Sequence, residues 1–499
     1  MSDESVTNSI EISREEERGH LIEAGELSLW LCCLPSVQTP HQEAPADSNS
    51  EESEASPRFQ TPEQHSEGET LAEDPLISRG WSIFRVPVHV REVDEGAYNP
   101  KIVSIGPSHR DEPGLRAMEA QKLRFLNRLR KRISQLNDAV NLENLENAME
   151  VLEKKTRECY SEHFENINSN DFVQMMVRDG CFIVELLRLY RKKYKGRDVK
   201  EPIFETRWML PTIARDLLML ENQLPMFVLH KIFELTTNFK ATTTPLNKLA
   251  LLFFEPLRPG KDKLTRDIFI NTEGECPHLL ALFQSTFNPS DSRLPTVRWK
   301  TWNQYHRLPG KGWVYNAKTL RDHGVQFVQK SGNLLDIEFK DKILKIPTLF
   351  IDDGTSPVLR NLIAYEQSNR YAAPYFSCLA VFLDSIVDTP DDIDILCNAG
   401  IIKQVKGGNK ELANFLNSLN KELEFDPEDC TITTQIVDIN NYCTSWKAKI
   451  IKILRSNTDF TRIALTYLSI VQTVISSSNF TSDNSQVVSP SPSPSPSPS

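Results

Sequence analysis

The segment DFVQMMVRDGCFIVELLRLY, residues 171–190, constrains the fold more than any other part of the 499-residue chain. Apolar side chains fall on nearly every face of this segment if it is helical. A helix that is apolar all round has to be covered by other elements. The sequence therefore predicts a central helix inside a body of several packed helices.

Helical patterns also dominate the rest of the body. Apolar residues recur at helical spacing at Leu115, Met118, Phe125, Leu126, Leu129 and Ile133. Residues 214–235 predict two helices, because Pro225 cannot continue the first and suits the first turn of the second. In TPDDIDILCNAG, the pattern predicts a helix with Thr389 as its N-cap, Pro390 in its first position and Gly400 beyond its end.

The period changes within residues 325–351. In LLDIEFK, Leu335, Ile337 and Phe339 alternate with charged residues, which is typical of a half-buried strand. Asp341 and the residue after it then turn the chain into the apolar run ILKIPTLFI. We therefore expect a mainly α fold of the α+β type, a bundle-like body of several helices with a small antiparallel β meander.

Charge is unevenly distributed along the chain. Residues 1–78 contain 18 acidic residues and three arginines, whereas the remainder contains 54 basic and 50 acidic residues. A segment so acidic and poor in large apolar residues cannot bury enough surface to fold, and the closing Ser-Pro repeat also lacks core-forming residues. The predicted organisation is an acidic, largely disordered tail at 1–79, a body at 80–458 with a helical half at 80–290 and a mixed half at 291–458, an apolar helix at 459–480, and a disordered Ser-Pro tail at 481–499.

Composition argues against metal, cofactor and nucleic-acid sites. The nine cysteines include no Cys-x-x-Cys pair, so we expect reduced thiols and no structural zinc. Residues 298–313, RWKTWNQYHRLPGKGW, interleave aromatic and basic side chains as some nucleic-acid-binding segments do. Because residues 79–499 have a net charge of only +4, we expect no nucleic-acid partner.

The stretch KIVSIGPSHRDEPGLRAMEAQK, residues 101–122, has the look of a reactive loop. Ser104 and His109 flank a Gly106-Pro107 turn, but the Gly-x-Ser-x-Gly pattern of a nucleophile elbow is absent. Gly-Pro turns the chain, and Pro113 suits a helix start. We interpret the stretch as a turn into a helix.

An acid–base role for the same loop is the enzyme alternative. His109 would work there with Glu119 or Asp179. Acidic residues within apolar helices, among them Asp179 and Glu221, are also able to pair with arginines inside the fold, and such buried pairs are usually structural. We expect no catalytic residues, and the enzyme remains an open alternative.

The run from Ile463 to Phe480 has no charge over 18 residues, which is near the lower limit for crossing a bilayer. Polar residues dilute it, so that residues 463–475 alone are mainly apolar and also suit an interfacial or core helix. Basic residues before it would place its N-terminal side in the cytosol if it spans. The membrane-segment candidates are Ile463, Leu465, Tyr467, Leu468, Ile470, Val471, Val474 and Ile475.

Ten short motifs occur in a familiar order. They are WSIFRVP, YNPKIVSIGPSHR, LRAMEAQKLRFL, MMVRDGCFIVELLR, DLLMLENQLPMFVL, AKTLRDHGVQF, LLDIEF, IPTLFIDD, RNLIAYEQ and NYC. Together they resemble the plant family known as domain of unknown function 247, over about residues 81–480. Residues in these motifs that we expect to be structurally important are Gly106, Pro107, His109, Asp179, Gly180, Glu221, Asn222, Gln223, Pro225 and Glu366.

The resemblance implies a mainly helical fold with a small sheet, a C-terminal transmembrane helix and work at the plasma membrane. Some members are linked to self-incompatibility, which implies recognition or signalling, and the family has no established catalytic residues. This chain departs from the family where Arg110 and Asp111 follow His109, in place of the second His and the Gly that members often have. Its C-terminal apolar run is also shorter and more polar than is usual.

These observations predict a non-enzymatic, membrane-associated plant protein of recognition or regulation that acts through protein partners. Its body would be cytosolic and its location the plasma membrane. A soluble scaffold in the cytoplasm, lacking a true anchor, is one alternative. An undescribed enzyme that uses the His109 loop is the other.

Overall fold

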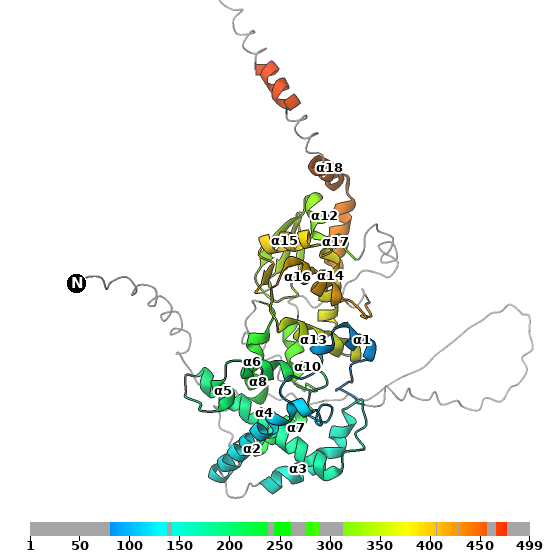
Figure 1. The fold of residues 1–499 in the computed structure, drawn as a ribbon. Coiled ribbons are helices and arrows are strands. Elements are labelled where there is room, and N and C mark those ends of the chain that lie inside the picture. The colour runs from blue at the N-terminus through cyan, green and yellow to red at the C-terminus, as the bar shows by residue number, and fades with distance from the viewer. Residues whose placement is uncertain are drawn as a thin grey trace, which may run out of the picture. The chain divides into compact units, whose positions relative to one another are not determined.

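The computed structural model describes residues 80–136, 142–237, 244–260, 276–288, 313–405, 407–426, 430–456 and 466–476 (Figure 1). The predicted tails at 1–79 and 481–499 lie outside these ranges, as does most of the aromatic and basic stretch at 298–313. The body boundaries at residues 290 and 458 also fall among residues that are not described. These boundaries therefore stay predictions.

Helix α4, Ser169–Tyr194, is the centre of the first part of the body. Its N-cap is Asn168, whose side chain accepts a hydrogen bond from the N–H of Asp171 at 2.9 Å. Fifteen of its 26 residues are buried. Four helices pack against it (Figure 1): α2 (Arg116–Leu136), α3 (Leu142–Glu158), α7 (Met226–Leu235) and α8 (Leu246–Phe254). The prediction of a central, covered helix is confirmed.

Shorter helices complete the described part of the fold. A 3-10 turn that begins at Pro113 leads into α2, in agreement with the expected helix start. The remaining helices are α1 (Val88–Val93), α5 (Pro202–Glu205), α6 (Met209–Asp216), α10 (Leu279–Gln284), α12 (Ala317–Asp322), α13 (Thr355–Ser368), α14 (Tyr375–Ile386), α15 (Pro390–Asn398), α16 (Asn409–Ser418), α17 (Thr433–Thr444), α18 (Trp446–Ser456) and an eleven-residue helix at 466–476.

Two small sheets accompany the helices. The first has the order β1-β3-β2, with β1 at Gln326–Lys330, β2 at Glu338–Lys340 and β3 at Ile343–Pro347. The second pairs β4 (Leu349–Ile351) with β5 (Ile402–Gln404) in parallel. The mainly α fold with a small sheet is thus confirmed.

The expected antiparallel meander is partly wrong. β2 and β3 are antiparallel and are joined through Asp341 and Lys342, which both have positive φ, as a tight hairpin requires. However, β1 pairs with β3 in parallel, so the chain crosses over between them. The strand expected from residue 335 also begins only at Glu338, because residues 334–335 form a turn.

Two predicted helix boundaries are confirmed and one is corrected. Thr389 and Asp392 form a capping box at the start of α15, and Gly400 follows its end with a φ of 72°. Pro225 is the N-cap of α7 rather than part of its first turn. The helix before it, α6, ends at Asp216, and residues 217–224 are an irregular, fully buried segment.

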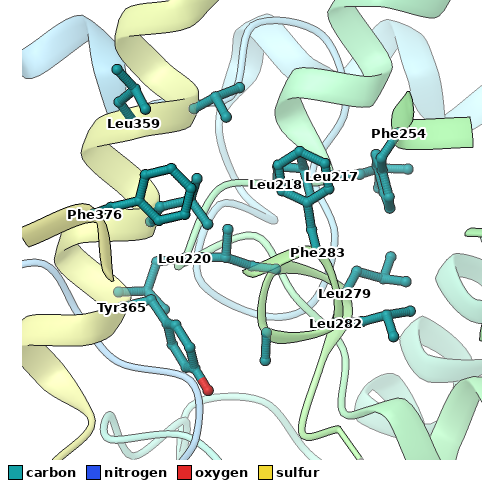
Figure 2. Close-up of a cluster of buried hydrophobic side chains, with 14 of the residues drawn as sticks. Leu217, Leu218, Leu220, Phe254, Leu279, Leu282, Phe283, Leu359, Tyr365 and Phe376 are labelled. Atoms are coloured by element: carbon teal, nitrogen blue, oxygen red, sulfur yellow. The ribbon is translucent and has the colours of Figure 1, made fainter. Parts of the chain in front are cut away.

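This buried segment lies in the hydrophobic core. Leu217, Leu218 and Leu220 meet apolar side chains from four helices, which are Phe254 of α8, Leu279, Leu282 and Phe283 of α10, Leu359 and Tyr365 of α13, and Phe376 of α14 (Figure 2). The backbone of the segment is held as well, because the N–H of Leu220 donates to the side chain of Asn361 at 2.9 Å. Residues 217–224 therefore tie α8 and α10 to α13.

Candidate functional site

The candidate site is built around residues 101–109, called here the 101–109 loop. The loop forms no strand, so its backbone groups need partners other than a neighbouring strand. One carboxylate supplies three of them, because Asp216 accepts hydrogen bonds from the N–H groups of residues 101, 102 and 103 at 3.0, 2.8 and 3.0 Å. Asp216 is fully buried at the end of α6. This side chain fixes the start of the loop.

Asn222 and Asp179 hold the next part of the loop. The side-chain oxygen of Asn222 accepts from the N–H of Ile105 at 2.6 Å, and its amide nitrogen donates to the carbonyl of Val103 at 2.9 Å. Asp179, on α4, accepts from the N–H of Gly106 at 3.0 Å. The loop is thus bound to two parts of the chain that follow it by more than 70 residues.

Gly106 has to be a glycine at this place. Its φ of 74° lies in the left-handed region, and a Cβ there would stand 2.7 Å from the carbonyl oxygen of Gln223. The hydroxyl of Tyr160 donates to that same carbonyl at 2.9 Å. The turn predicted at Gly106 and Pro107 is present, and Pro107 is buried.

Asp179 also forms a buried ion pair. The Nζ of Lys122 lies 2.7 Å from Asp179 and 2.6 Å from Glu119. The side chains of Lys122 and Asp179 are only 2 and 3% exposed. Burial opposes the charge of Lys122, but the two carboxylates together raise its pKa. Glu119 also binds Arg178 at 3.0 Å, so it shares its charge with a second cation.

Glu221 is the second buried carboxylate of the site. One oxygen accepts from the N–H of Val86 at 2.7 Å and from Arg91 at 2.5 Å, and the other lies 3.2 Å from Arg85. Burial works against its charge, but His109, the Val86 N–H and the two arginines lower its pKa. Glu221 therefore stays ionised and attaches the segment that precedes α1 to the core.

His109 lies between two glutamates. Its Nδ1 is 2.5 Å from Glu112 and its Nε2 is 3.4 Å from Glu221, a distance for electrostatic attraction but not for a direct hydrogen bond through that nitrogen. The ring is 3% exposed. The enzyme alternative paired His109 with Glu119 or Asp179, and both of these bind Lys122 instead.

The remaining motif residues of this region have packing roles. Gly180 lies where α4 crosses α7, and a Cβ there would stand 2.3 Å from the Cδ1 of Ile232. The side chain of Gln223 donates to the carbonyls of Leu217 and Met219 at 2.8 and 2.7 Å, which holds the irregular segment in shape. The motif residues from Gly106 to Pro225 therefore gather around the 101–109 loop and α4.

A family model described as a plant protein of unknown function, DUF247, matches residues 83–476. The chain belongs to this family. Among the curated relatives, UPF0481 protein At3g47200 of Arabidopsis thaliana is 29% identical over 385 residues, which cover 73% of this chain and 77% of the relative. Putative UPF0481 protein At3g02645 of the same plant is 24% identical and covers 79% and 90%. No solved structure matches.

Glu366, the last DUF247 motif residue, lies in a separate place on α13. Its carboxylate accepts from the N–H groups of Phe376 and Ser377 at 3.0 and 2.8 Å, which are at the start of α14. The amide of Gln284 donates to it at 3.1 Å. Burial raises the pKa of Glu366 to about 7. The residue lines a cavity of about 590 Å³ between α13 and the segment around residue 425.

Three contributors to the DUF247 site were missed from sequence alone. Residues 116–132 contain several cations, and nothing in the spacing of Lys122 marks it as the buried one. Asp216 accepts hydrogen bonds from backbone N–H groups, which its place in the sequence does not indicate. Asn361 binds both Leu220 and the carbonyl of Ala97. Polar residues inside apolar runs, as in MLENQL at residues 219–224, were the sequence signal that could have indicated this buried network.

The C-terminal candidates are described only in part. Six of the eight membrane-segment candidates lie in the helix at 466–476 and are exposed, whereas Ile463 and Leu465 lie outside the described residues. Within the described ranges, no helix combines the length and the apolar character that a bilayer crossing requires. The same ranges contain no cluster of three or more His, Cys, Asp or Glu side chains that could hold a metal ion.

Proposed function

We propose that this DUF247 protein is a non-enzymatic, membrane-associated recognition or regulatory protein that acts through protein partners. The observation that carries the membrane part is where its exposed apolar side chains lie. Ten of the 18 large hydrophobic residues that are exposed among the described residues fall within residues 446–475. Contiguous exposed apolar surface marks a site of contact with a membrane or a partner.

Helix α18 has the pattern of a helix that lies in a membrane interface. Trp446, Ile450, Ile453 and Leu454 recur along one side and are 68, 46, 57 and 39% exposed, whereas Ala448 on the other side is buried. Lysines 447, 449 and 452 flank the apolar side. A tryptophan, an apolar stripe and flanking lysines together suit an interface with anionic lipid.

The helix at 466–476 also exposes large apolar side chains. Tyr467, Leu468, Val474 and Ile475 are all more than half exposed. Eleven residues span about 16 Å, roughly half of a bilayer core. The basic residues that precede it favour a cytosolic body if the longer segment at 459–480 inserts. The plasma membrane is the location that the family resemblance implies, and it is the location that we propose.

The non-enzymatic part rests on how the buried polar groups are used. Asp216, Asn222 and Asp179 are occupied by backbone N–H groups or by Lys122. Arg85 and Arg91 neutralise Glu221. Side chains whose polar atoms are occupied by partners within the protein stabilise the fold and are not free to act on a substrate.

Fractionation of plant cells tests the membrane proposal. The full chain and a chain that ends at Thr458 are expressed, and the membranes are washed at alkaline pH. We expect only the full chain to resist the wash and to follow a plasma-membrane marker. If both chains wash off, the protein is a peripheral or soluble scaffold, and the acidic tail becomes the first place to search for partners.

A variant separates the contribution of α18. Changing Trp446, Ile450, Ile453 and Leu454 to glutamine should lower the membrane-bound fraction before the wash. A matched control changes four exposed apolar residues elsewhere to glutamine, namely Val88, Val151, Tyr371 and Val405. Equal losses in the two variants would show that general hydrophobicity, not α18, governs attachment.

Affinity purification tests the partner proposal. The full chain and a chain without residues 1–79 are captured from plant membranes under mild conditions. We expect specific proteins to be enriched with the full chain. Recovery of nothing but abundant housekeeping proteins with both chains would contradict a role in recognition.

One observation favours the enzyme as a second candidate. His109 is buried between Glu112 and Glu221, and such an arrangement can move a proton. The variant His109→Gln distinguishes the two candidates. A folded variant with full partner binding and full biological activity supports the structural role. A folded variant that binds its partners but has lost activity supports catalysis.

A further inference from the structure

A basic hollow of about 280 Å³ lies at the C-terminal end of α4, and the sequence analysis did not single it out. Six cationic residues line it, and no carboxylate does among the described residues. They come from three places, which are α2, the last two turns of α4 and the loop that follows α4. They are Arg132, Arg188, Arg191, Lys192, Lys195 and Arg197.

The described residues balance the positive charge of this basic hollow only in part. Glu185 is the buried carboxylate beside it, and it is shared by Arg128, Arg132 and Arg188 at 3.3, 2.7 and 3.7 Å. The four other cations of the hollow form no side-chain hydrogen bond or ion pair within the described ranges. Burial and the nearby Arg132 lower the pKa of Lys192, as expected where like charges crowd together.

Arg188 is held in place with one end unsatisfied. Its side chain is 9% exposed, and its Nη2 donates to both the carbonyl and the hydroxyl of Thr236, at 3.2 and 2.9 Å. Among the described residues, its Nη1 has no hydrogen-bond acceptor, and the carboxylate of Glu185 lies 3.7 Å from it. A buried donor without an acceptor costs stability, so an anionic ligand at this position would satisfy a group that the protein leaves open.

Helix termini explain part of this arrangement but not all of it. Cations in the last turn of a helix stabilise the negative end of its dipole, which accounts for Arg191 and Lys192. It does not account for Arg132, which belongs to α2, or for Arg197, which lies beyond the end of α4. The ion pair with Glu185 accounts for Arg132, but no side-chain hydrogen bond or ion pair among the described residues accounts for Lys195 and Arg197 on the same concave surface.

We propose that this basic hollow binds a compact molecule that carries several phosphate groups, such as a polyol polyphosphate. Guanidinium groups match phosphate oxygens in pairs, and an excess of cations over carboxylates suits a ligand with several negative charges. A hollow of about 280 Å³ suits a compact ligand such as one substituted ring. The same chemistry occurs free in solution and as the headgroup of a phosphorylated lipid.

Titration calorimetry of the full chain tests the site with two probes, inositol hexakisphosphate and inorganic phosphate. We expect one molecule of the hexakisphosphate to bind, about a hundredfold more tightly than inorganic phosphate, because several charge-assisted hydrogen bonds form at once. A pocket variant carries Arg191→Gln, Lys192→Gln, Lys195→Gln and Arg197→Gln. It should bind the hexakisphosphate about a hundredfold more weakly.

A control variant removes the same net charge from elsewhere on the surface. It carries Arg116→Gln, Lys154→Gln, Lys403→Gln and Lys410→Gln, which are all exposed positions. Its affinity for the hexakisphosphate should equal that of the unmodified chain. An equal loss in both variants would mean that net charge, and not this basic hollow, governs binding, and the proposal would be wrong.

Flotation with vesicles distinguishes the two sources of the ligand. The full chain is mixed with phosphatidylcholine vesicles that contain either phosphatidylinositol bisphosphate or an equal charge of phosphatidylserine. A preference for the phosphoinositide that the pocket variant loses assigns a lipid headgroup. Tight binding of the free probe without such a preference assigns a soluble ligand. Both results support the site.

Three further results would overturn the proposal. The first is no binding of the hexakisphosphate to the full chain. The second is competition by a short single-stranded oligonucleotide that equals the hexakisphosphate at equal phosphate concentration. The third applies if the pocket variant fails to fold, and it uses hydrogen exchange of the unmodified chain with and without the hexakisphosphate. If the probe gives no protection at residues 188–197, the proposal is wrong. The site does not depend on the proposed membrane function, because its readout is binding of a soluble probe.

Discussion

Replacing Lys122 by methionine should destabilise the protein through a single buried carboxylate. Methionine keeps an unbranched, long side chain in the same space, but it leaves Asp179 without its cation. Asp179 would retain the N–H of Gly106 as its hydrogen-bond donor. Burial already raises the pKa of Asp179 against the opposing effect of Lys122, so the substitution should raise it further.

The size of the effect follows from the proton that Asp179 must take up. Holding an aspartate protonated at pH 7, when its unfolded pKa is about 3.9, costs about 4 kcal/mol, and at pH 5 it costs about 1.5 kcal/mol. These values are upper limits for the stability that is lost when Asp179 has to be neutral in the folded state. The first agrees with the roughly 3–5 kcal/mol that the removal of one partner from a buried ion pair costs.

The sign of the pH dependence is fixed by the same argument. In the Lys122→Met variant the folded state binds more protons than the unfolded state above pH 3.9, so its unfolding free energy falls as pH rises. Urea denaturation followed by tryptophan fluorescence, at pH 5 and pH 7, should show a larger deficit at pH 7. A Glu119→Gln control should lose less than about 1 kcal/mol, because Glu119 is 35% exposed.

The double variant Lys122→Met/Asp179→Asn completes the test. The neutral amide oxygen of asparagine can still accept from Gly106, and no charge remains buried. We expect most of the stability at pH 7 to return, with no added pH dependence. A deficit in Lys122→Met that is equal at both pH values, or a double variant as unstable as the single, would refute the electrostatic reasoning.

Three further changes test other parts of the structure by denaturation. Gly106→Ala should cost about 2–4 kcal/mol, from its left-handed φ and from the close approach to Gln223; a loss under 1 kcal/mol would argue against this geometry. Glu366→Gln should flatten the pH dependence, because a folded pKa of about 7 makes the unmodified protein lose about 3–4 kcal/mol between pH 4.3 and 7; an unchanged slope would contradict it. Thr389→Ala should cost about 1 kcal/mol through the lost capping box, whereas the control Ser331→Ala, at an exposed position away from any N-cap, should cost much less.

Features that depend on neighbours in sequence were predictable. The capping pattern at Thr389 and the turn at Asp341 are local, and the structure has both. The central position of α4 was also readable, because apolar residues on all of its faces leave no surface for water. Each of these conclusions needed fewer than 30 consecutive residues.

Pairing between distant segments was not predictable in the same way. The sequence gives no reason for β1 to pair with β3 in parallel rather than follow it in a meander, because the choice depends on the path of the chain between them. In the candidate site, Asp216 and Asn222 bind backbone groups that precede them by more than 100 residues. An apolar run that contains such polar residues signals a buried network, but it does not name their partners.

The distances along the chain within this network have a consequence for synthesis. The carbonyl of Ala97 is bound by Asn361, which is 264 residues later. At about 5–20 residues per second, the ribosome makes that partner roughly 13–53 s after Ala97. For roughly the first 6–24 s of this time, Val103 and Ile105 lack the partner that Asn222 supplies, because Asn222 is made 119 residues after Val103. The N-terminal segment is therefore made first but completes its contacts only after α13 has been made, and the nascent chain should need protection from aggregation until then.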